Sequence, residues 1–186
     1  FYTKEAVTSE DYGRIINAKR FDTLLSYLQQ GTIVYGGKYD KENLFIEPTI
    51  LDNVNVNSTI MTEEIFGPVL PVFTFNTKAE AVELINKNPN PLSFYVFTSS
   101  IKKEEDWLQT IPFGGGCVNN TVYHFANDNL HFGGIGNSGI GSYHGKQSFY
   151  TFTHAKPVMK TPTWLDPAIK YPPFKNKLKW IKLLLR

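Results

Sequence analysis

The amino-acid sequence predicts an α/β fold, in which helices pack against a β-sheet. The chain has 186 residues, which is enough for one domain with a buried core. Segments with helical and with extended patterns alternate from Ser9 to Val122, and no internal repeat or low-complexity segment interrupts them. This alternation is typical of a sheet that is covered by helices.

Three segments have the pattern of helices. Ser9 or Asp11 can cap a helix over Ser9–Gln30. A partial apolar stripe supports this helix, namely Ile15, Ile16, Leu24, Leu25 and Leu28. A shorter helix is expected over Lys78–Lys87, and a polar helix over Lys102–Ile111.

Extended segments lie between these helices. They are bounded by glycine and proline, and several are rich in β-branched and aromatic residues, as strands are. The expected extended segments are Thr32–Gly37, Asn43–Val54, Gly67–Phe75, Leu92–Ser100 and the end of Gly114–Val122. Pro71 lies inside the third of them, and a proline within a strand predicts an edge position or a bulge.

Composition excludes several classes of protein. The net charge is +2 at pH 7, which argues against a general nucleic-acid-binding protein. Cys117 is the one cysteine, so no internal disulfide can form, and this fits a reducing compartment. No apolar stretch reaches the roughly 20 residues that span a bilayer. Because the chain starts with Phe1 and not with methionine, we expect it to be a piece of a longer protein.

The stretch EEIFGPVLPVF, Glu63–Phe73, allows two interpretations. In the first, two adjacent carboxylates form a solvated acidic turn before a buried strand. In the second, a carboxylate and the Phe66 ring point into a ligand-binding cleft. The residues of this stretch do not decide between the two.

The segment Phe132–Lys146 contains six glycines. This density indicates backbone positions with positive φ, or a close approach of the backbone to another group. Gly134–Gly139 also matches the dinucleotide pattern G-x-G-x-x-G, but it opens no obvious helix and no carboxylate follows about 20 residues later. We therefore expect the floor or wall of a cleft, with a plain structural loop as the alternative.

Few other side chains suggest chemistry. The four histidines fit no metal-ligand spacing, so no metal site is predicted from His124, His131, His144 and His154. His144 is the candidate among them because it lies within the glycine-rich segment. Cys117 follows three glycines and is expected to be a buried, inert thiol. Ser138 and Ser142 do not fit the pattern G-x-S-x-G of hydrolases.

Two stretches together are similar to the aldehyde dehydrogenase superfamily, namely EEIFGPVLPV and FGGIGNSGIGSYHGKQSFYTFTH. The stretches DYGRII, Asp11–Ile16, and YPP, Tyr171–Pro173, resemble the class 3 branch, which includes the fatty aldehyde dehydrogenases. The resemblance extends over nearly the whole chain, in the same order and with similar spacing. It implies an NAD- or NADP-dependent enzyme that oxidises a medium- or long-chain aldehyde to a carboxylic acid.

The resemblance implies roles for two groups of residues. In the first group, Glu64 accepts hydrogen bonds from the nicotinamide ribose hydroxyls of NAD or NADP, Phe66 packs beside that ribose, and Glu63 is structural. The second group lies in the glycine-rich loop, which lines the active site and the substrate tunnel. Its site residues are Phe132, Gly133, Gly134, Asn137, Ser138 and His144.

The resemblance also implies that this chain holds no catalytic residue. The family's nucleophilic cysteine, general-base glutamate and oxyanion-hole asparagine lie upstream of the residue that matches Phe1, and Cys117 does not match the nucleophile. We therefore expect the chain alone to be inactive. His131 stands where the family usually has proline, which changes the start of the loop locally. The alternatives are a non-catalytic, truncated subunit that pairs with intact subunits, and a fragment without a role of its own.

The resemblance divides the chain into three parts. Residues 1–146 match part of the catalytic domain, residues 147–160 match a late strand in the oligomerisation sheet of a homodimer, and residues 161–186 form an extended tail. The tail resembles the segment that covers the substrate entrance in fatty aldehyde dehydrogenases. It ends in a candidate basic amphipathic helix with Leu178, Ile181, Leu184 and Leu185 on one face. We expect this helix to lie on the cytoplasmic side of a membrane such as the endoplasmic reticulum.

Overall fold

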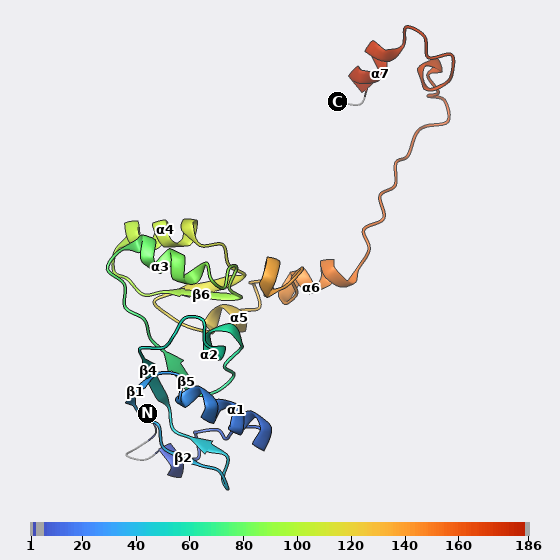
Figure 1. Cartoon of the computed structure of the whole chain (residues 1–186). Coiled ribbons are helices and arrows are strands. Elements are labelled where there is room, and N and C mark those ends of the chain that lie inside the picture. The colour runs from blue at the N-terminus through green and yellow to red at the C-terminus, as the bar shows by residue number, and fades with distance from the viewer. Residues whose placement is uncertain (1, 3–5, 185–186) are drawn as a thin grey trace.

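The structure is a computed structural model that describes Tyr2 and residues 6–184. Helices and short strands alternate along the chain, so the predicted α/β fold is confirmed. Figure 1 shows a body that contains all the strands, and a long C-terminal segment that leads away from it.

The described elements are short. The strands are β1 (Thr32–Tyr35), β2 (Tyr39–Asp40), β3 (Phe45–Ile46), β4 (Thr49–Asp52), β5 (Val69–Pro71), β6 (Ser93–Val96) and β7 (Gly115–Val118). The α-helices are α1 (Ala18–Leu28), α2 (Thr59–Thr62), α3 (Lys78–Ile85), α4 (Ile101–Thr110), α5 (Tyr123–Ala126), α6 (Gly145–Phe152) and α7 (Leu178–Leu184). Three 3₁₀ turns complete them: η1 (Ala6–Thr8), η2 (Gly136–Ser138) and η3 (Ala168–Lys170).

The first half of the chain forms a three-stranded sheet with the strand order β1–β4–β5. β1 and β4 pair antiparallel, whereas β4 and β5 pair in parallel with Thr49 opposite Val69. β5 is therefore an edge strand, which confirms the edge position predicted from Pro71. It is shorter than the predicted segment Gly67–Phe75. β2 and β3 pair with each other as a separate antiparallel hairpin.

α1 begins later than the sequence predicted. The Asn17 side chain accepts a hydrogen bond from the Arg20 N–H at 2.8 Å, and this bond caps the helix. The predicted helix Ser9–Gln30 is therefore too long at its start. The preceding residues are not helical because the Ile15 N–H donates to the carbonyl of Leu44, 2.9 Å away. This hydrogen bond ties the segment before α1 to the turn between β2 and β3.

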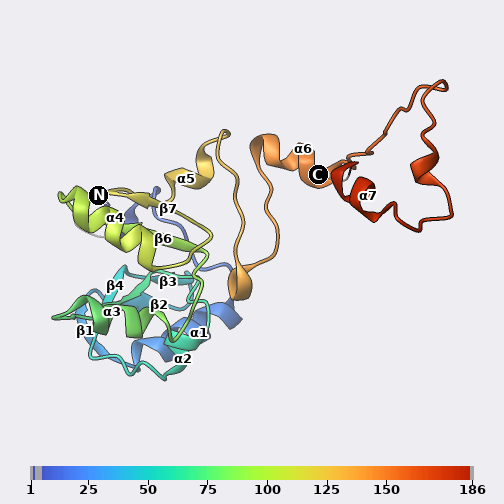
Figure 2. The ribbon, with the colours of Figure 1, turned by 90° about the horizontal axis from the view of Figure 1, so that it is seen from above.

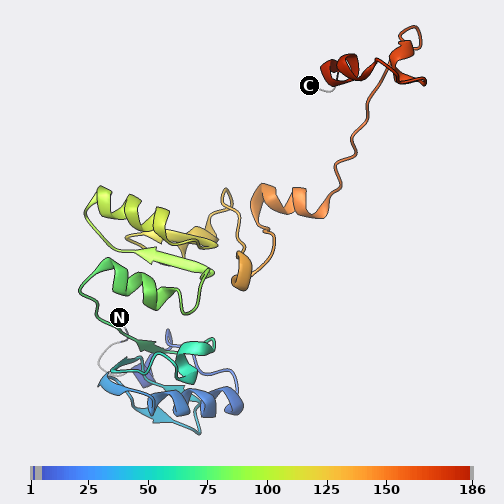
Figure 3. The same ribbon diagram turned by 45° about the horizontal axis from the view of Figure 1, so that its top comes forward.

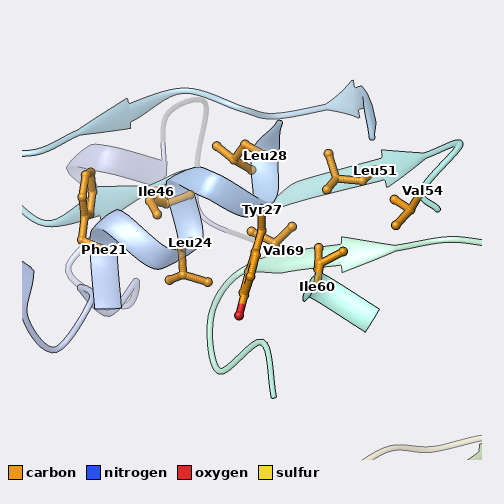
Figure 4. Packing of buried hydrophobic residues seen from close by; sticks show 9 residues of the cluster. All are labelled: Phe21, Leu24, Tyr27, Leu28, Ile46, Leu51, Val54, Ile60 and Val69. Atoms are coloured by element: carbon orange, nitrogen blue, oxygen red, sulfur yellow. The ribbon is translucent and has the colours of Figure 1, made fainter. Parts of the chain in front are cut away.

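One face of α1 forms the centre of the hydrophobic core (Figure 4). Its core residues are three or four positions apart and are almost fully buried, as on the inner stripe of an amphipathic helix: Phe21, Leu24, Tyr27 and Leu28. They pack against strands, α2 and the loop after β4 through Ile46, Leu51, Val54, Ile60 and Val69. In Figure 4 the Tyr27 hydroxyl points out of this cluster, toward the chain that enters β5.

The second pair of strands lies beside α3 and α4 (Figure 3). β6 and β7 are parallel, and α4 makes the crossover between them. The Trp107 ring of α4 packs against Phe94 of β6, with 6.4 Å between ring centroids. Lys78 of α3 lies 5.3 Å from the centroid of the Trp107 ring and 2.6 Å from the Asp106 carboxylate. These contacts join α3, α4 and β6 into one packed group.

The segment after the glycine-rich loop departs from the prediction. Residues 147–152 belong to helix α6, so the predicted strand 147–160 is wrong over this stretch. The helix is favoured because the His144 carbonyl accepts from the Ser148 N–H at 3.4 Å, while the Ser148 hydroxyl accepts from the His144 N–H at 2.7 Å. Residues 153–160 are exposed and form neither helix nor strand. Their pairing with another chain stays a prediction.

Beyond α6 the chain runs away from the body and ends in a small cluster of its own (Figures 1 and 2). Helix α7 has seven residues and confirms that the predicted basic stretch is helical. Leu185, which was expected on its apolar face, lies outside the described residues, as does Arg186. Among residues 2 and 6–184, none of the helices is long and apolar enough to cross a membrane.

Tyr12 makes the folded chain sensitive to alkaline pH. Its hydroxyl donates to the Ile46 carbonyl at 2.7 Å, and burial raises the pKa of Tyr12 to about 12. As pH rises, the unfolded chain releases this proton first, at a pKa of about 10. The contribution of Tyr12 to the free energy of unfolding therefore falls as pH rises from about 10 to about 12. We expect Tyr12→Phe to lose less stability over this range in urea unfolding.

Tyr35→Phe is the matched control, because the Tyr35 side chain is 63% exposed. It should follow the pH dependence of the wild-type chain. If Tyr12→Phe followed the wild-type curve as well, the partly buried Tyr12 hydroxyl would not be the source of the effect.

Candidate functional site

The corner formed by Glu63, Glu64, Ile65 and Phe66 lies between α2 and β5. The Glu63 N–H donates to the Thr59 carbonyl at 3.0 Å and so closes α2. Phe66 then adopts a φ of +39°, a backbone conformation that residues other than glycine rarely adopt. Gly67 and Pro68 lead from it into β5. The chain therefore turns sharply at this corner.

The two carboxylates of the corner differ in their surroundings. The Tyr27 hydroxyl donates to Glu63 Oε2 at 2.7 Å. Burial raises the pKa of Tyr27, and the neighbouring Glu63 carboxylate raises it further. The Glu64 carboxylate is exposed and forms no hydrogen bond or ion pair within the described part of the chain. The Glu63 carboxylate thus has a hydrogen-bond partner within the chain, which agrees with the structural role expected for it, and the Glu64 carboxylate has none in the described part of the chain.

A hollow of about 550 Å³ lies beside the corner. Phe66, Gly67 and Pro68 form one wall. The rest of its border comes from the segment before α1 and from the first turn of that helix: Tyr12, Gly13, Arg14, Ile15, Ile16 and Arg20. The Phe66 ring is 70% exposed at this hollow, so it can pack against a ligand there.

The glycine-rich loop is closed by an isolated bridge between Phe132 and Tyr143. Each N–H donates to the other residue's carbonyl, at 2.8 and 2.9 Å. A second hollow, of about 370 Å³, lies at this loop and is bordered by Phe132, Gly133, Gly134 and Ser138. These four predicted site residues therefore meet at one hollow.

The other features of the loop follow from its turns. The Ser138 hydroxyl accepts from the Ile135 N–H at 3.0 Å and donates to the Ile135 carbonyl at 3.1 Å, so it stabilises the turn. Asn137 lies on the 3₁₀ turn η2, is exposed, and does not border the hollow. Because η2 is a single 3₁₀ turn and no α-helix starts there, the structure supports rejection of a dinucleotide fingerprint at Gly134–Gly139.

His144 does not border this hollow within the described chain. Its Nδ1 lies 3.4 Å from the Leu130 carbonyl, and its Nε2 lies 3.8 Å from the Asp128 carboxylate. The side chain thus fastens the start of α6 to the turn over residues 128–130. No group of three or more histidine, cysteine or acidic residues that could hold a metal ion occurs in residues 2 and 6–184.

The structure brings together two residues that the sequence did not pair. Cys117 Sγ lies 3.6 Å from Nδ1 of His124, which is 8% exposed. The His124 ring packs against Tyr95 and Phe132, with 5.8 and 6.1 Å between centroids. Through the contact of His124 with Phe132, the pair therefore packs against the start of the glycine-rich loop. No sequence signal identified it, because α5 must fold back on β7 before the two side chains meet.

The corner and the glycine-rich loop border separate hollows, and no described residue borders both. The loop between α3 and β6 connects them. Asn88 Nδ2 donates to the carbonyl of Met61 in α2 at 2.8 Å. The Asn90 side chain lies against Gly136, where an added Cβ would be 2.7 Å from Asn90 Nδ2. One short loop thus contacts the helix before the corner at one point and η2 at another.

Comparison with known proteins finds one family. The aldehyde dehydrogenase family matches residues 4–158. Over its whole length the chain is 45% identical to 4,4'-diaponeurosporen-aldehyde dehydrogenase of Staphylococcus aureus and 44% identical to aldehyde dehydrogenase family 3 member H1 of Arabidopsis thaliana. It covers 41% and 39% of these relatives. The dimeric NADP-preferring aldehyde dehydrogenase of Canis lupus familiaris is 39% identical over 96% of the chain and 40% of that relative.

Solved structures agree with these relatives. A substrate-bound state of Staphylococcus aureus AldH has a TM-score of 0.90 and 44% identity, with all of this chain and 41% of that chain covered. An aldehyde dehydrogenase of Mycobacterium tuberculosis complexed with NAD+ has a TM-score of 0.70 and 28% identity, over 80% of this chain and 32% of that chain. This chain thus spans about two fifths of the length of the curated relatives it matches.

The glycine-rich loop depends on the absence of a side chain at Gly134. A Cβ there would lie 2.2 Å from the Ser138 carbonyl oxygen, which is closer than real Cβ contacts. We expect Gly134→Ala to lower the free energy of unfolding by about 1–3 kcal/mol, as overpacking does. Urea unfolding of the chain measures this change.

Gly13→Ala is the matched control, because an added Cβ at Gly13 meets open space. It should leave stability unchanged or raise it by up to about 1 kcal/mol. Equal stabilities for the two variants would show that the loop does not need glycine at position 134.

Proposed function

The chain belongs to the aldehyde dehydrogenase family, and on this premise we propose that it is the C-terminal part of an enzyme that oxidises an aldehyde to a carboxylic acid with NAD or NADP. In this proposal the nucleophile and the general base lie upstream in the whole protein. The chain itself binds and orients the reactants and is inactive alone.

The observation that carries this proposal is the exposed Glu64 carboxylate, which has no partner in the described chain, two positions before the exposed Phe66 ring. A carboxylate can accept two hydrogen bonds from neighbouring hydroxyls, and charge strengthens both bonds. A ring next to it limits where a flat nicotinamide can lie. The donor and acceptor chemistry of the corner therefore fits the nicotinamide ribose of NAD or NADP.

The chain's part in the reaction follows from the corner. When bound, the cofactor accepts a hydride from the substrate. Glu64 holds the ribose next to the nicotinamide, and Phe66 restricts its position. Such positioning accelerates a reaction because the reacting atoms start close together and aligned. Glu63 does not take part in this positioning, since its carboxylate already accepts a hydrogen bond from the Tyr27 hydroxyl.

The hollow at the glycine-rich loop supports an apolar aldehyde as the substrate. Its border combines glycine backbone with large apolar side chains, namely Leu92, Phe132, Ile140, Tyr143 and Phe152. Backbone without side chains leaves room, and the apolar side chains favour a hydrocarbon over a charged group. In this proposal the loop forms the wall of the substrate site for a medium- or long-chain aldehyde.

The exposed segment 153–160 supports a homodimer. Val158 and Met159 are 68% and 90% exposed, and the segment pairs with no strand in the described chain. An extended segment of this kind can add as a strand to a sheet edge of a second subunit. The relative from Canis lupus familiaris is named dimeric. The same segment would serve a truncated, non-catalytic subunit that pairs with intact ones.

The tail helix supports contact with a membrane surface. Leu178, Trp180 and Leu183 are more than 60% exposed, and Lys179 and Lys182 are exposed beside them. Several other apolar groups of the tail border a hollow of about 550 Å³, whose lining residues are Met159, Thr161, Leu165, Pro167, Ile169, Lys170, Phe174 and Ile181. Lysines near an anionic surface and a tryptophan at headgroup depth both favour interfacial binding. We place the tail on the cytoplasmic side of such a membrane.

Glu64 provides the test of the proposed function. In the intact enzyme that contains this chain, Glu64→Gln should lower kcat/KM for the cofactor, because it weakens charged hydrogen bonds to the ribose. The decrease should correspond to a loss of about 1.5–3 kcal/mol of transition-state stabilisation. Glu63→Gln is the matched control, since its amide oxygen can still accept the Tyr27 hydroxyl. Steady-state kinetics with equal losses for the two variants would contradict the assignment of Glu64.

Vesicle co-sedimentation tests the tail. We expect the whole chain to bind vesicles of anionic lipid at low salt, and a chain that ends at Tyr171 not to bind. The double variant Lys179→Gln/Lys182→Gln should bind more weakly by about 2 kcal/mol, because each lysine near the surface contributes about 1 kcal/mol. Lys102→Gln/Lys103→Gln on α4 is the control. Equal binding of the full-length and the shortened chain would show that the tail is a structural cover.

A further inference from the structure

Helix α1 contacts the corner at three successive points of one face. Arg20, Leu24 and Tyr27 are four and three residues apart, so their side chains lie in a row along the helix. Each of them contacts a different part of the segment Glu63–Gly67. The helix therefore runs along the whole corner and not only along its end.

Arg20 holds the middle of the corner. Its Nη2 donates to the carbonyls of Glu64 and Ile65, which are the two peptide oxygens before Phe66. The Arg20 Nε is buried and has no hydrogen-bond partner in the described chain. A guanidinium has its donors in a rigid plane, so one group can fix two neighbouring carbonyls in direction. Those directions set where the Glu64 and Phe66 side chains point.

Leu24 and Tyr27 hold the two ends. The Tyr27 hydroxyl donates to Glu63 Oε2 at 2.7 Å, before the carbonyls that Arg20 binds. Beyond them, Gly67 lies directly on Leu24, where an added Cβ would be 2.5 Å from Leu24 Cδ1. Leu24 is fully buried and Tyr27 is 1% exposed, so both ends are fixed by the core.

The middle needs such a contact because Phe66 has an unfavourable backbone conformation. A non-glycine residue with φ near +40° is in a sparsely populated, strained conformation, which persists only where the surrounding structure determines it. Two hydrogen bonds to the preceding carbonyls supply this determination. Without them, the backbone can relax, which would turn the Phe66 ring away from the hollow that it borders and redirect the Glu64 carboxylate.

We propose that Arg20 is a positioning residue for the nicotinamide end of the cofactor: it orients Glu64 and Phe66 through the two backbone carbonyls that it binds. The inference rests on the proposed function, since it assigns the ribose contact to Glu64. It adds a residue 44 positions away in sequence from Glu64 to the machinery of the site. Loss of Arg20 should affect the nicotinamide half of the cofactor and leave the adenosine half unaffected.

Binding to the intact enzyme that contains this chain tests the proposal. Calorimetry measures the affinities for NAD and for ADP, which lacks the nicotinamide and its ribose. Arg20→Met should weaken NAD binding about tenfold, because charged hydrogen bonds to two carbonyls are lost, and should leave ADP binding unchanged. Arg20→Lys keeps the charge without the planar fork, so an intermediate loss is expected. Lys19→Met, an exposed neighbour in the first turn of α1, should bind both ligands as the wild type does.

Hydrogen exchange of the present chain tests the contacts without any cofactor. Arg20→Met should speed exchange of the N–H groups of residues 64–67 at least severalfold relative to Lys19→Met. Unchanged exchange, unchanged NAD affinity, or an equal loss of ADP affinity would each overturn the positioning role. A wild-type enzyme that binds no NAD would instead overturn the proposed function, while the exchange experiment would still decide whether Arg20 holds the corner.

Discussion

Burial of one face of α1 is the interaction on which the described body of the chain depends. Phe21 and Leu24 are fully buried against residues from β3, β4 and β5. Burial of each such side chain contributes about 1.5–3 kcal/mol, which exceeds the contribution of a typical hydrogen bond. The same packing sets the distance between α1 and the segment that enters β5. The position of the candidate site is therefore a consequence of core packing.

Sequence patterns predicted most of the helices and strands but not all of their boundaries. Lys78–Lys87 and Lys102–Ile111 were predicted as helices and match α3 and α4, which the side chains of Thr77 and Ser100 cap within the same stretch of chain. Two predictions failed, the first because of a contact that is distant in sequence and the second because of hydrogen bonds between His144 and Ser148. The segment before α1 is held by a hydrogen bond to Leu44, and α6 forms where the family resemblance implied a strand.

The sequence likewise predicted some features of the candidate site and missed others. A resemblance between short motifs was enough to assign different roles to Glu63 and Glu64, and the hydrogen bond from Tyr27 agrees with the structural role of Glu63. The contacts of Arg20, Tyr27 and Leu24 with the corner join residues 36 to 45 positions apart. No pattern within a helix reports such distant contacts. The pairing of Cys117 with His124 was missed for a related reason, since it depends on the path of α5.

The two parallel strand pairs suggest how this part of the chain folds. β4 and β5 are joined through α2, and β6 and β7 through α4, so each parallel pair closes over a short connection. Within the described residues, no strand of one pair belongs to the sheet of the other. Short connections cost little loop entropy and favour rapid folding. Each strand–helix–strand unit can therefore form as a local nucleus without waiting for contacts with distant segments, and the two nuclei then need only to dock.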